Sequence, residues 1–376
     1  MSPKTHSFVA SSISVFALLA SLSGVSAQEQ KPTIKDRVDT AVATVTGSPM
    51  ANADTDMKHV LDALKKLDPK PIEKLSAAEA RQQPSAADAV KQLLKDQGKS
   101  TAPEPGVTTK DLTYSGPGGS QPARIYTPDG ASGQPLPVVV YYHGGGFVIA
   151  DLDTYDATPR AIAQMANAIV VSVEYRHAPE NKFPAAHEDA LAAYKWAAEN
   201  AKSFGGDASK LAILGESAGG NLAINTAIAV RDQNAPKPVY VVAVYPMAGT
   251  DLNTQSYKDN ADAKPLNKPM MQWFYDNAKG SDADLQDPRL NIVGKADLKG
   301  LPPTTVVTVE IDPLRSEGQM LADKLKQAGV PVQARDYTGV THEFFGMGNV
   351  VQKAKEAEMA AAQDLKTAFT GSAPSR

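Results

Sequence analysis

The sequence predicts an α/β protein built on a doubly wound, mostly parallel sheet. Short apolar runs rich in β-branched residues alternate with helical patterns over most of the chain. These runs show no alternation of polar and apolar residues, which is typical of parallel strands buried on both faces. The chain has 376 residues, of which 42% are hydrophobic, so it is long enough to bury one large core.

The composition excludes several classes of function. The net charge of −4 provides no basic patch, so we expect no nucleic-acid partner. The sequence contains no cysteine. Disulfides, thiolate metal sites and a cysteine nucleophile are therefore excluded together.

The N-terminus has the pattern of a targeting segment. Lys4 and His6 precede an apolar run over residues 8–20, and the small residues 25–27 follow. This order predicts a secretory signal peptide over residues 1–27, cleaved after Ala27, and hence a secreted or periplasmic protein. An uncleaved membrane anchor is the alternative, but serines interrupt the apolar run and the run is short, so we expect no stable membrane insertion after cleavage.

Three helical stretches are expected ahead of the sheet. Residues 28–55 are polar and without a period, which indicates a flexible leader. Within residues 56–100, helical spacing is present over 57–67, 76–83 and 85–97. The second stretch opens with a serine followed three residues later by glutamate, the pattern of a capping box.

Residues 101–376 are expected to form the main domain. Helical patterns over 185–201 and 220–231 lie between the strand-like runs, and an apolar stripe predicts a last helix that packs back on the sheet. Residues 251–299 break the alternation, so we expect an excursion above the sheet. The expected strands are residues 138–142, 169–173, 211–214, 240–244, 305–309 and 332–337.

A G-x-S-x-G motif places a serine between a strand and a helix. Gly215 to Gly219 follow the apolar run 211–214 and precede a helical pattern. The glycines allow a turn sharp enough to expose the serine, and the helix that follows directs its N-terminal N–H groups back toward it. We therefore predict that Ser217 is a nucleophile.

A serine nucleophile needs a base and an acid. In α/β-hydrolases these follow the serine in the order acid, then histidine, and His342 is the histidine that lies after Ser217. Asp312 comes just past the strand 305–309 and is the preferred acid. Glu310, Glu317 and Asp251 are the rival carboxylates.

A second glycine-rich stretch directly follows the first buried strand. His143 is followed by three glycines, Gly144 to Gly146. Successive glycines allow backbone N–H groups to face a substrate closely, as an oxyanion hole requires. The predicted donors are the N–H groups of Gly145, Gly146 and Ala218.

Together these motifs resemble the bacterial branch of the hormone-sensitive-lipase-like family of α/β-hydrolase esterases. The resemblance covers the chain from about residue 57 onward and extends to the segments 174–180, 312–315 and 341–345. It implies hydrolysis of short- to medium-chain carboxylic esters through a Ser-His-Asp triad and an acyl-enzyme, without a cofactor. It also implies that the N-terminal helices and the excursion form a cap. Glu216 stands where many relatives have Asp, and Ser316 where an acidic residue is usual.

Several alternatives remain open from the sequence. The same triad would serve a lactonase, an amidase or an acyltransferase, and a non-catalytic ligand-binding protein could share the fold. No H-E-x-x-H motif or carboxylate cluster accompanies His177 or His187, so we expect no metal. An edge strand or the last helix could support a homodimer. An aromatic and methionine-rich stretch either lines the substrate pocket or packs the cap: Met270, Met271, Trp273, Phe274 and Tyr275.

Overall fold

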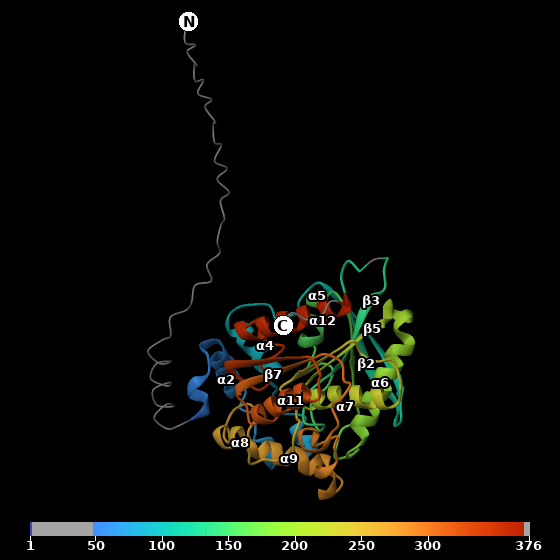
Figure 1. Ribbon diagram of the computed structural model, residues 1–376. Coiled ribbons are helices and arrows are strands. Elements are labelled where there is room, and N and C mark those ends of the chain that lie inside the picture. The colour runs from blue at the N-terminus through green and yellow to red at the C-terminus, as the bar shows by residue number, and fades with distance from the viewer. Residues whose placement is uncertain (2–47, 132, 372–376) are drawn as a thin grey trace.

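The computed structural model describes Met1 and residues 48–131 and 133–371, and the expected signal peptide and most of the leader lie outside these residues. Its centre is an eight-stranded sheet with the order β1-β2-β4-β3-β5-β6-β7-β8 (Figure 1). The strands are β1 (Val107–Gly116), β2 (Gly119–Pro128), β3 (Leu136–Tyr142), β4 (Ile169–Val173), β5 (Gly206–Glu216), β6 (Tyr240–Val244), β7 (Thr304–Ile311) and β8 (Val332–Thr341).

The sheet is parallel from β4 to β8 and antiparallel at one edge. β3 pairs in parallel with both β4 and β5, and β5, β6, β7 and β8 continue the parallel series. β1 and β2 form an antiparallel hairpin that joins the sheet through β4. The predicted mostly parallel, doubly wound sheet is confirmed, and the hairpin adds an edge that the apolar runs did not indicate.

One local expectation is corrected by the structure. The apolar pattern predicted a last strand over residues 332–337, but β8 continues to Thr341. The pairing of β7 with β8 shifts register between Val309 and Ile311, and Gly339 adopts a φ of 70°. The register shift accommodates the positive φ of Gly339, so the strand continues past this residue instead of ending before it.

Helices cover both faces of the sheet. Alternate residues of the central strands separate into two cores: Val138 and Val241 pack with α6 (Ala185–Asn200), α7 (Ala218–Asp232) and α11 (Arg315–Gln327). On the opposite face, Val139 and Val242 pack with α5 (Ala157–Ala166) and α12 (Gln352–Phe369). Figure 1 shows the sheet between these two layers.

Apart from η3 (Ala201–Phe204), which follows α6, the remaining helices come from the two segments that were expected to form a cap. The N-terminal segment contains η1 (Pro49–Asn52), α2 (Thr55–Lys66), η2 (Ile72–Lys74), α3 (Ala77–Ala80) and α4 (Ala86–Asp96). Residues 251–299 contain α8 (Gln255–Asp259), α9 (Lys268–Ala278), η4 (Asp282–Gln286) and α10 (Ile292–Lys295). The capping box of Ser76 and Glu79 is present at the start of α3.

Two side chains tie these segments to each other and to the sheet domain. The Trp273 Nε1–H of α9 donates to the Leu75 carbonyl at 3.1 Å. The Arg81 guanidinium, at the end of α3, donates to the carbonyls of Val148 and Ala178 and to the Glu180 carboxylate. No helix in the described part of the chain is both long and apolar enough to cross a bilayer.

The packing of α12 on the sheet generates a stability prediction. The Leu365 side chain is fully buried, whereas Met359 on the same helix is 54% exposed. Leu365→Ala should lower the free energy of unfolding by about 2–5 kcal/mol, because it leaves a cavity. Met359→Ala should change it by less than about 0.5 kcal/mol. Urea unfolding of both variants measures the difference, and equal values would contradict the packing of this helix.

Candidate active site

Ser217 occupies a strained backbone position at the junction of β5 and α7. Its φ of 55° and ψ of −115° lie outside the regions that non-glycine residues ordinarily adopt. The Ser217 N–H donates to the Val244 carbonyl at 2.9 Å, and its carbonyl accepts from the N–H groups of Met247 and Asn221. These bonds hold the serine on the tip of a sharp turn, where its side chain is 5% exposed.

The glycines of the motif are required by close contacts. A Cβ on Gly215 would overlap the Gly219 carbonyl, and a Cβ on Gly219 would overlap the Tyr142 carbonyl. The first turn of α7 therefore lies directly against the ends of β3 and β5. This contact brings the G-x-S-x-G turn beside the glycine-rich loop that follows β3.

The structure brings Ser217, His342 and Asp312 into one hydrogen-bonded series. His342 Nε2 lies 3.0 Å from Ser217 Oγ, and His342 Nδ1 lies 2.8 Å from Asp312 Oδ2. The other oxygen of Asp312 accepts the Leu314 N–H at 2.8 Å. The Asp312 side chain is fully buried and the His342 side chain is 3% exposed, so water is largely kept from both groups.

The surroundings raise the pKa of His342 above its ordinary value of 6.5. Burial is the largest single influence and lowers the pKa, because it penalises the charged imidazolium. The charge and hydrogen bond of Asp312 oppose it, assisted by Glu343 and Glu216, and together they outweigh it. An imidazolium formed at this position is therefore stabilised by nearby negative charge.

The rival carboxylates do not contact His342. Glu310 accepts hydrogen bonds from Asn52 and from the Gly339 N–H. Glu317 is buried beneath the loop after β6 and accepts the Ala248 N–H at 2.9 Å. Asp251 accepts the Asn253 N–H in a surface turn.

The expected oxyanion donors belong to two loops that converge beside Ser217. Gly145 and Gly146 have φ values of 100° and 60°, a conformation that suits glycine. Among the hydrogen bonds of the described residues, none uses the N–H of Gly145 or Gly146 as donor. Ala218 is the first residue of α7, where the N–H has no partner within the helix.

The peptide group between Gly144 and Gly145 is held in place through its carbonyl oxygen. The Gly144 carbonyl lies 2.7 Å from His143 Nδ1 and accepts the Tyr175 hydroxyl at 3.1 Å. Because the C=O and N–H of a trans peptide point in opposite directions, these two contacts turn the Gly145 N–H away from His143. The motif histidine thus positions a predicted donor.

Glu216, which the sequence left without a role, anchors a buried polar network. One oxygen accepts the Tyr141 hydroxyl at 2.6 Å and the other accepts the Tyr245 hydroxyl in a very short bond. The Tyr245 ring packs on the His342 ring, with centroids 4.4 Å apart. Burial raises the pKa of Glu216 to about 7, although the tyrosine hydrogen bonds oppose this shift.

Three further contacts near the triad were not indicated by the sequence. The Tyr155 hydroxyl donates to both oxygens of Glu343, the residue after His342. The Asn260 amide donates to the Asp312 carbonyl at 3.2 Å, and so links the excursion to the acid loop. Ser316, the other departure from the family pattern, accepts the Ser256 N–H at 3.1 Å and strengthens the same link.

A large cavity of about 2280 Å³ opens beside Ser217 and His342. Its lining includes Met270, Met271 and Phe274, three of the residues expected at the pocket. Trp273 and Tyr275 are not part of this lining: Trp273 bonds to Leu75, and the Tyr275 hydroxyl donates to the Gly249 carbonyl at 2.5 Å. Met270, Met271 and Phe274 therefore form the cavity-facing side of α9, and Trp273 and Tyr275 flank that side.

Comparison with known proteins agrees with this geometry. A family described as the alpha/beta hydrolase fold matches residues 139–346, more than half of the chain. Carboxylesterase NlhH of Mycobacterium tuberculosis is 41% identical over 252 residues, which cover 66% of this chain and 78% of the relative. Ethyl acetate hydrolase of Pseudomonas putida is 34% identical over 297 residues, which cover 76% and 88%.

A solved structure extends the likeness to three dimensions. An esterase of Pyrobaculum calidifontis superposes with a TM-score of 0.72 at 37% identity, covering 81% of this chain and 97% of that one. The chain belongs to the alpha/beta hydrolase family. It is an ester hydrolase of the hormone-sensitive-lipase-like branch, as the resemblance predicted.

The glycine-rich loop generates a prediction about activity. A Cβ on Gly146 would overlap the Phe274 ring, and the residue also has a positive φ. Gly146→Ala should therefore displace the loop and lower kcat/KM by ~10²-fold or more, the effect of losing an oxyanion donor.

Gly130→Ala is the matched control for this variant. Gly130 also has a positive φ, but a Cβ there has no neighbour within 4 Å. The control should keep its esterase activity despite the backbone strain. Equal activity of both variants would show that the loop after β3 does not need its observed conformation.

Proposed function

We propose that this protein is a serine carboxylesterase that acts through an acyl-enzyme, with Ser217 as nucleophile, His342 as base and Asp312 as the orienting acid. The observation that carries the proposal is the continuous series from Ser217 Oγ through both ring nitrogens of His342 to the buried Asp312 carboxylate. A lone serine is a weak nucleophile, and this arrangement is the one that activates it.

In the acylation half, His342 accepts the Ser217 proton as Oγ attacks the ester carbonyl. Nδ1 faces the Asp312 carboxylate, so it carries a proton, and Nε2 is left free to act as the base. The carbonyl oxygen gains negative charge in the tetrahedral intermediate. The N–H groups of Gly145, Gly146 and Ala218 would stabilise that charge without reorganisation, because the loop and the helix start hold them in place.

The imidazolium then gives its proton to the leaving alcohol, which completes acylation. In the second half, His342 accepts a proton from the water that attacks the acyl-enzyme and returns it to Ser217 Oγ as the acid product leaves. Asp312 stabilises the imidazolium in both halves and keeps the ring orientation fixed. The packing of Tyr245 on the imidazole, braced by Glu216, supports the same orientation. The residues present supply every proton transfer of the cycle.

For the substrate we propose short- to medium-chain esters, with the N-terminal helices and residues 251–299 acting as a cap. Both segments contribute to the cavity lining, among them Ile72, Arg81 and Phe274. A relative at 34% identity is named for ethyl acetate hydrolysis, which favours a short acyl group. From the N-terminal sequence we further propose export of the protein by a signal peptide cleaved after Ala27.

The central test is Ser217→Ala, measured with p-nitrophenyl acetate, butyrate, octanoate and laurate. The variant should lose ~10⁴-fold or more in kcat, because the nucleophile is gone. Ser203→Ala, at an exposed serine of η3 (Ala201–Phe204), should retain the wild-type rate. A Ser217→Ala enzyme with most of the wild-type rate would refute the mechanism, and a preference for laurate would refute the proposed chain length.

The pH dependence of kcat/KM tests the role of His342. The imidazole must be neutral to act as base, so activity should fall as pH decreases through its pKa. Since Asp312 holds that pKa above 6.5, the midpoint should lie on the alkaline side of this value. Asp312→Asn should lower both the midpoint and the rate. A wild-type profile that stays flat down to about pH 5 would exclude His342 as the base.

A further inference from the structure

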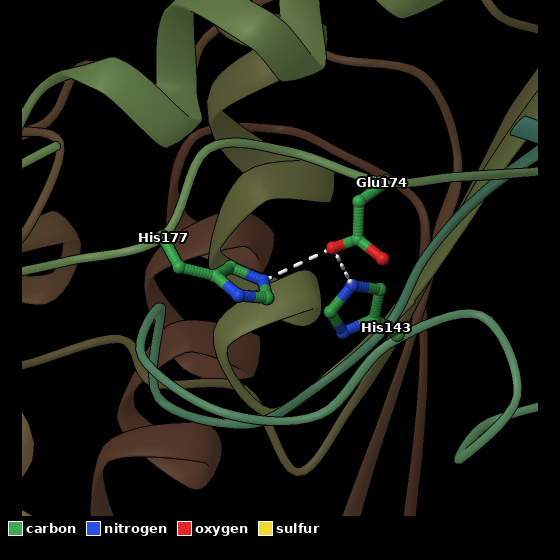
Figure 2. Close-up of side chains that lie close together, drawn as sticks. All are labelled: His143, Glu174 and His177. Carbon is green, nitrogen blue, oxygen red and sulfur yellow. Dashed lines mark hydrogen bonds and ion pairs between the residues drawn. The ribbon is translucent and has the colours of Figure 1, made fainter. Parts of the chain in front are cut away.

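Two histidines and a glutamate meet behind the glycine-rich loop. His143 directly follows β3, and Glu174 and His177 belong to the loop that leaves β4 (Figure 2). The Nε2 atoms of both histidines lie 3.0 Å from the same oxygen, Glu174 Oε1. The three possible ligand atoms all lie within 4.8 Å of one another.

The tautomer of His143 can be derived from its contacts. Nδ1 lies 2.7 Å from the Gly144 carbonyl oxygen, which can only accept, so Nδ1 carries a proton. In a neutral ring, Nε2 then presents its lone pair, and that lone pair faces the Glu174 carboxylate at 3.0 Å. Two acceptors do not approach so closely unless a cation lies between them. The cation is either a second proton on the ring or a metal ion.

The contact of His177 favours a metal. Its Nε2 is buried and has no hydrogen-bond partner among the described residues, although it lies 3.0 Å from Glu174 Oε1. The two atoms are close but no hydrogen bond joins them, so a shared proton does not account for this contact. A buried polar atom without a partner is costly and calls for a ligand.

We propose that His143, Glu174 and His177 form a binding site for a divalent transition metal ion of the Zn²⁺ type. Two imidazoles and a carboxylate are ligands that zinc prefers. A ligating histidine characteristically donates its other ring N–H to a carbonyl, as His143 does to Gly144. The ion would replace the proton that otherwise lies between His143 and Glu174.

The geometry needs only small adjustments to accept the ion. Tetrahedral zinc with bonds of about 2.0–2.2 Å separates its ligand atoms by about 3.4 Å. The two nitrogen–oxygen separations are 3.0 Å, and the separation of the two nitrogens does not exceed 4.8 Å. Glu174 and His177 line the large cavity, so water can reach the fourth position.

The site would brace the loop that carries the predicted oxyanion donors. Metal bonds at Nε2 leave the Nδ1 contact of His143 to the Gly144 carbonyl intact. The ion would then join the end of β3 to the loop after β4, two segments 31 positions apart in the sequence. Its role would be structural, and the inference is independent of the proposed ester hydrolysis.

The test is a calorimetric titration of the chelator-treated, full-length protein with ZnCl₂. We expect a single saturable site per chain and a rise in Tm on saturation, because the ion binds the folded state. Co²⁺ at the same site should show the strong visible absorption of a tetrahedral complex, which does not depend on any activity. Absence of saturable Zn²⁺ binding would overturn the proposal.

Two variants and one control assign the binding to this cluster. His177→Gln and Glu174→Gln should each weaken Zn²⁺ binding by ~10-fold or more. The same change at His59→Gln, on α2, should leave it unchanged. Tm and far-UV circular dichroism without metal will verify that each variant is folded, and a misfolded variant leaves the other to decide. Equal affinity in wild type and both cluster variants would place the ion elsewhere, for example at His342 and Asp312, and would overturn the proposal. Equal weakening in the His59 variant would also overturn it.

Discussion

The strained turn at Ser217 is the constraint on which the rest of the site depends. A serine at φ 55° is stable only where its neighbours enforce the position. Here Gly219 lies so close to the Tyr142 carbonyl that no side chain fits, and the Val244 carbonyl fixes the Ser217 N–H. The ends of three adjacent parallel strands, β3, β5 and β6, therefore hold one residue. The same contacts bring the glycine-rich loop to the serine, so they position both the proposed nucleophile and the predicted oxyanion donors.

Buried polar groups connect this turn with the imidazole of His342. Glu216, beside Ser217, accepts hydrogen bonds from the hydroxyl groups of Tyr141 on β3 and of Tyr245 just after β6. The ring of Tyr245 packs on His342. A carboxylate buried at such cost is retained only if its hydrogen bonds are satisfied, and both of its oxygens are bonded. The residue therefore connects the strand that carries Ser217 with the ring that would accept its proton.

The segments outside the sheet are joined to the chemistry by a few specific bonds. Asn260 and Ser316 couple the excursion to the loop of Asp312, and Arg81 couples the N-terminal helices to Val148, just beyond the glycine-rich loop. Movement of the excursion would therefore shift the loop of Asp312, and movement of the N-terminal helices would shift the loop that carries the predicted oxyanion donors. Such coupling would let the proposed cap influence catalysis as well as access.

The sheet class, the turn at Ser217 and the selection of His342 could be predicted from the sequence, because each depends on local pattern or on chain order. These patterns are the apolar runs, the glycine motifs and the single histidine that follows Ser217 in the sequence. Contacts between residues distant in the sequence could be assigned only from the folded chain. The structure shows that Asp312 bonds to His342, whereas Glu310, two positions earlier, bonds to Asn52. It turned Trp273 and Tyr275 away from the cavity, assigned Glu216 to its tyrosines, and brought His177 to Glu174 and His143. The physical reason is that side-chain direction and long-range contacts are set by packing, which spacing along the chain does not encode.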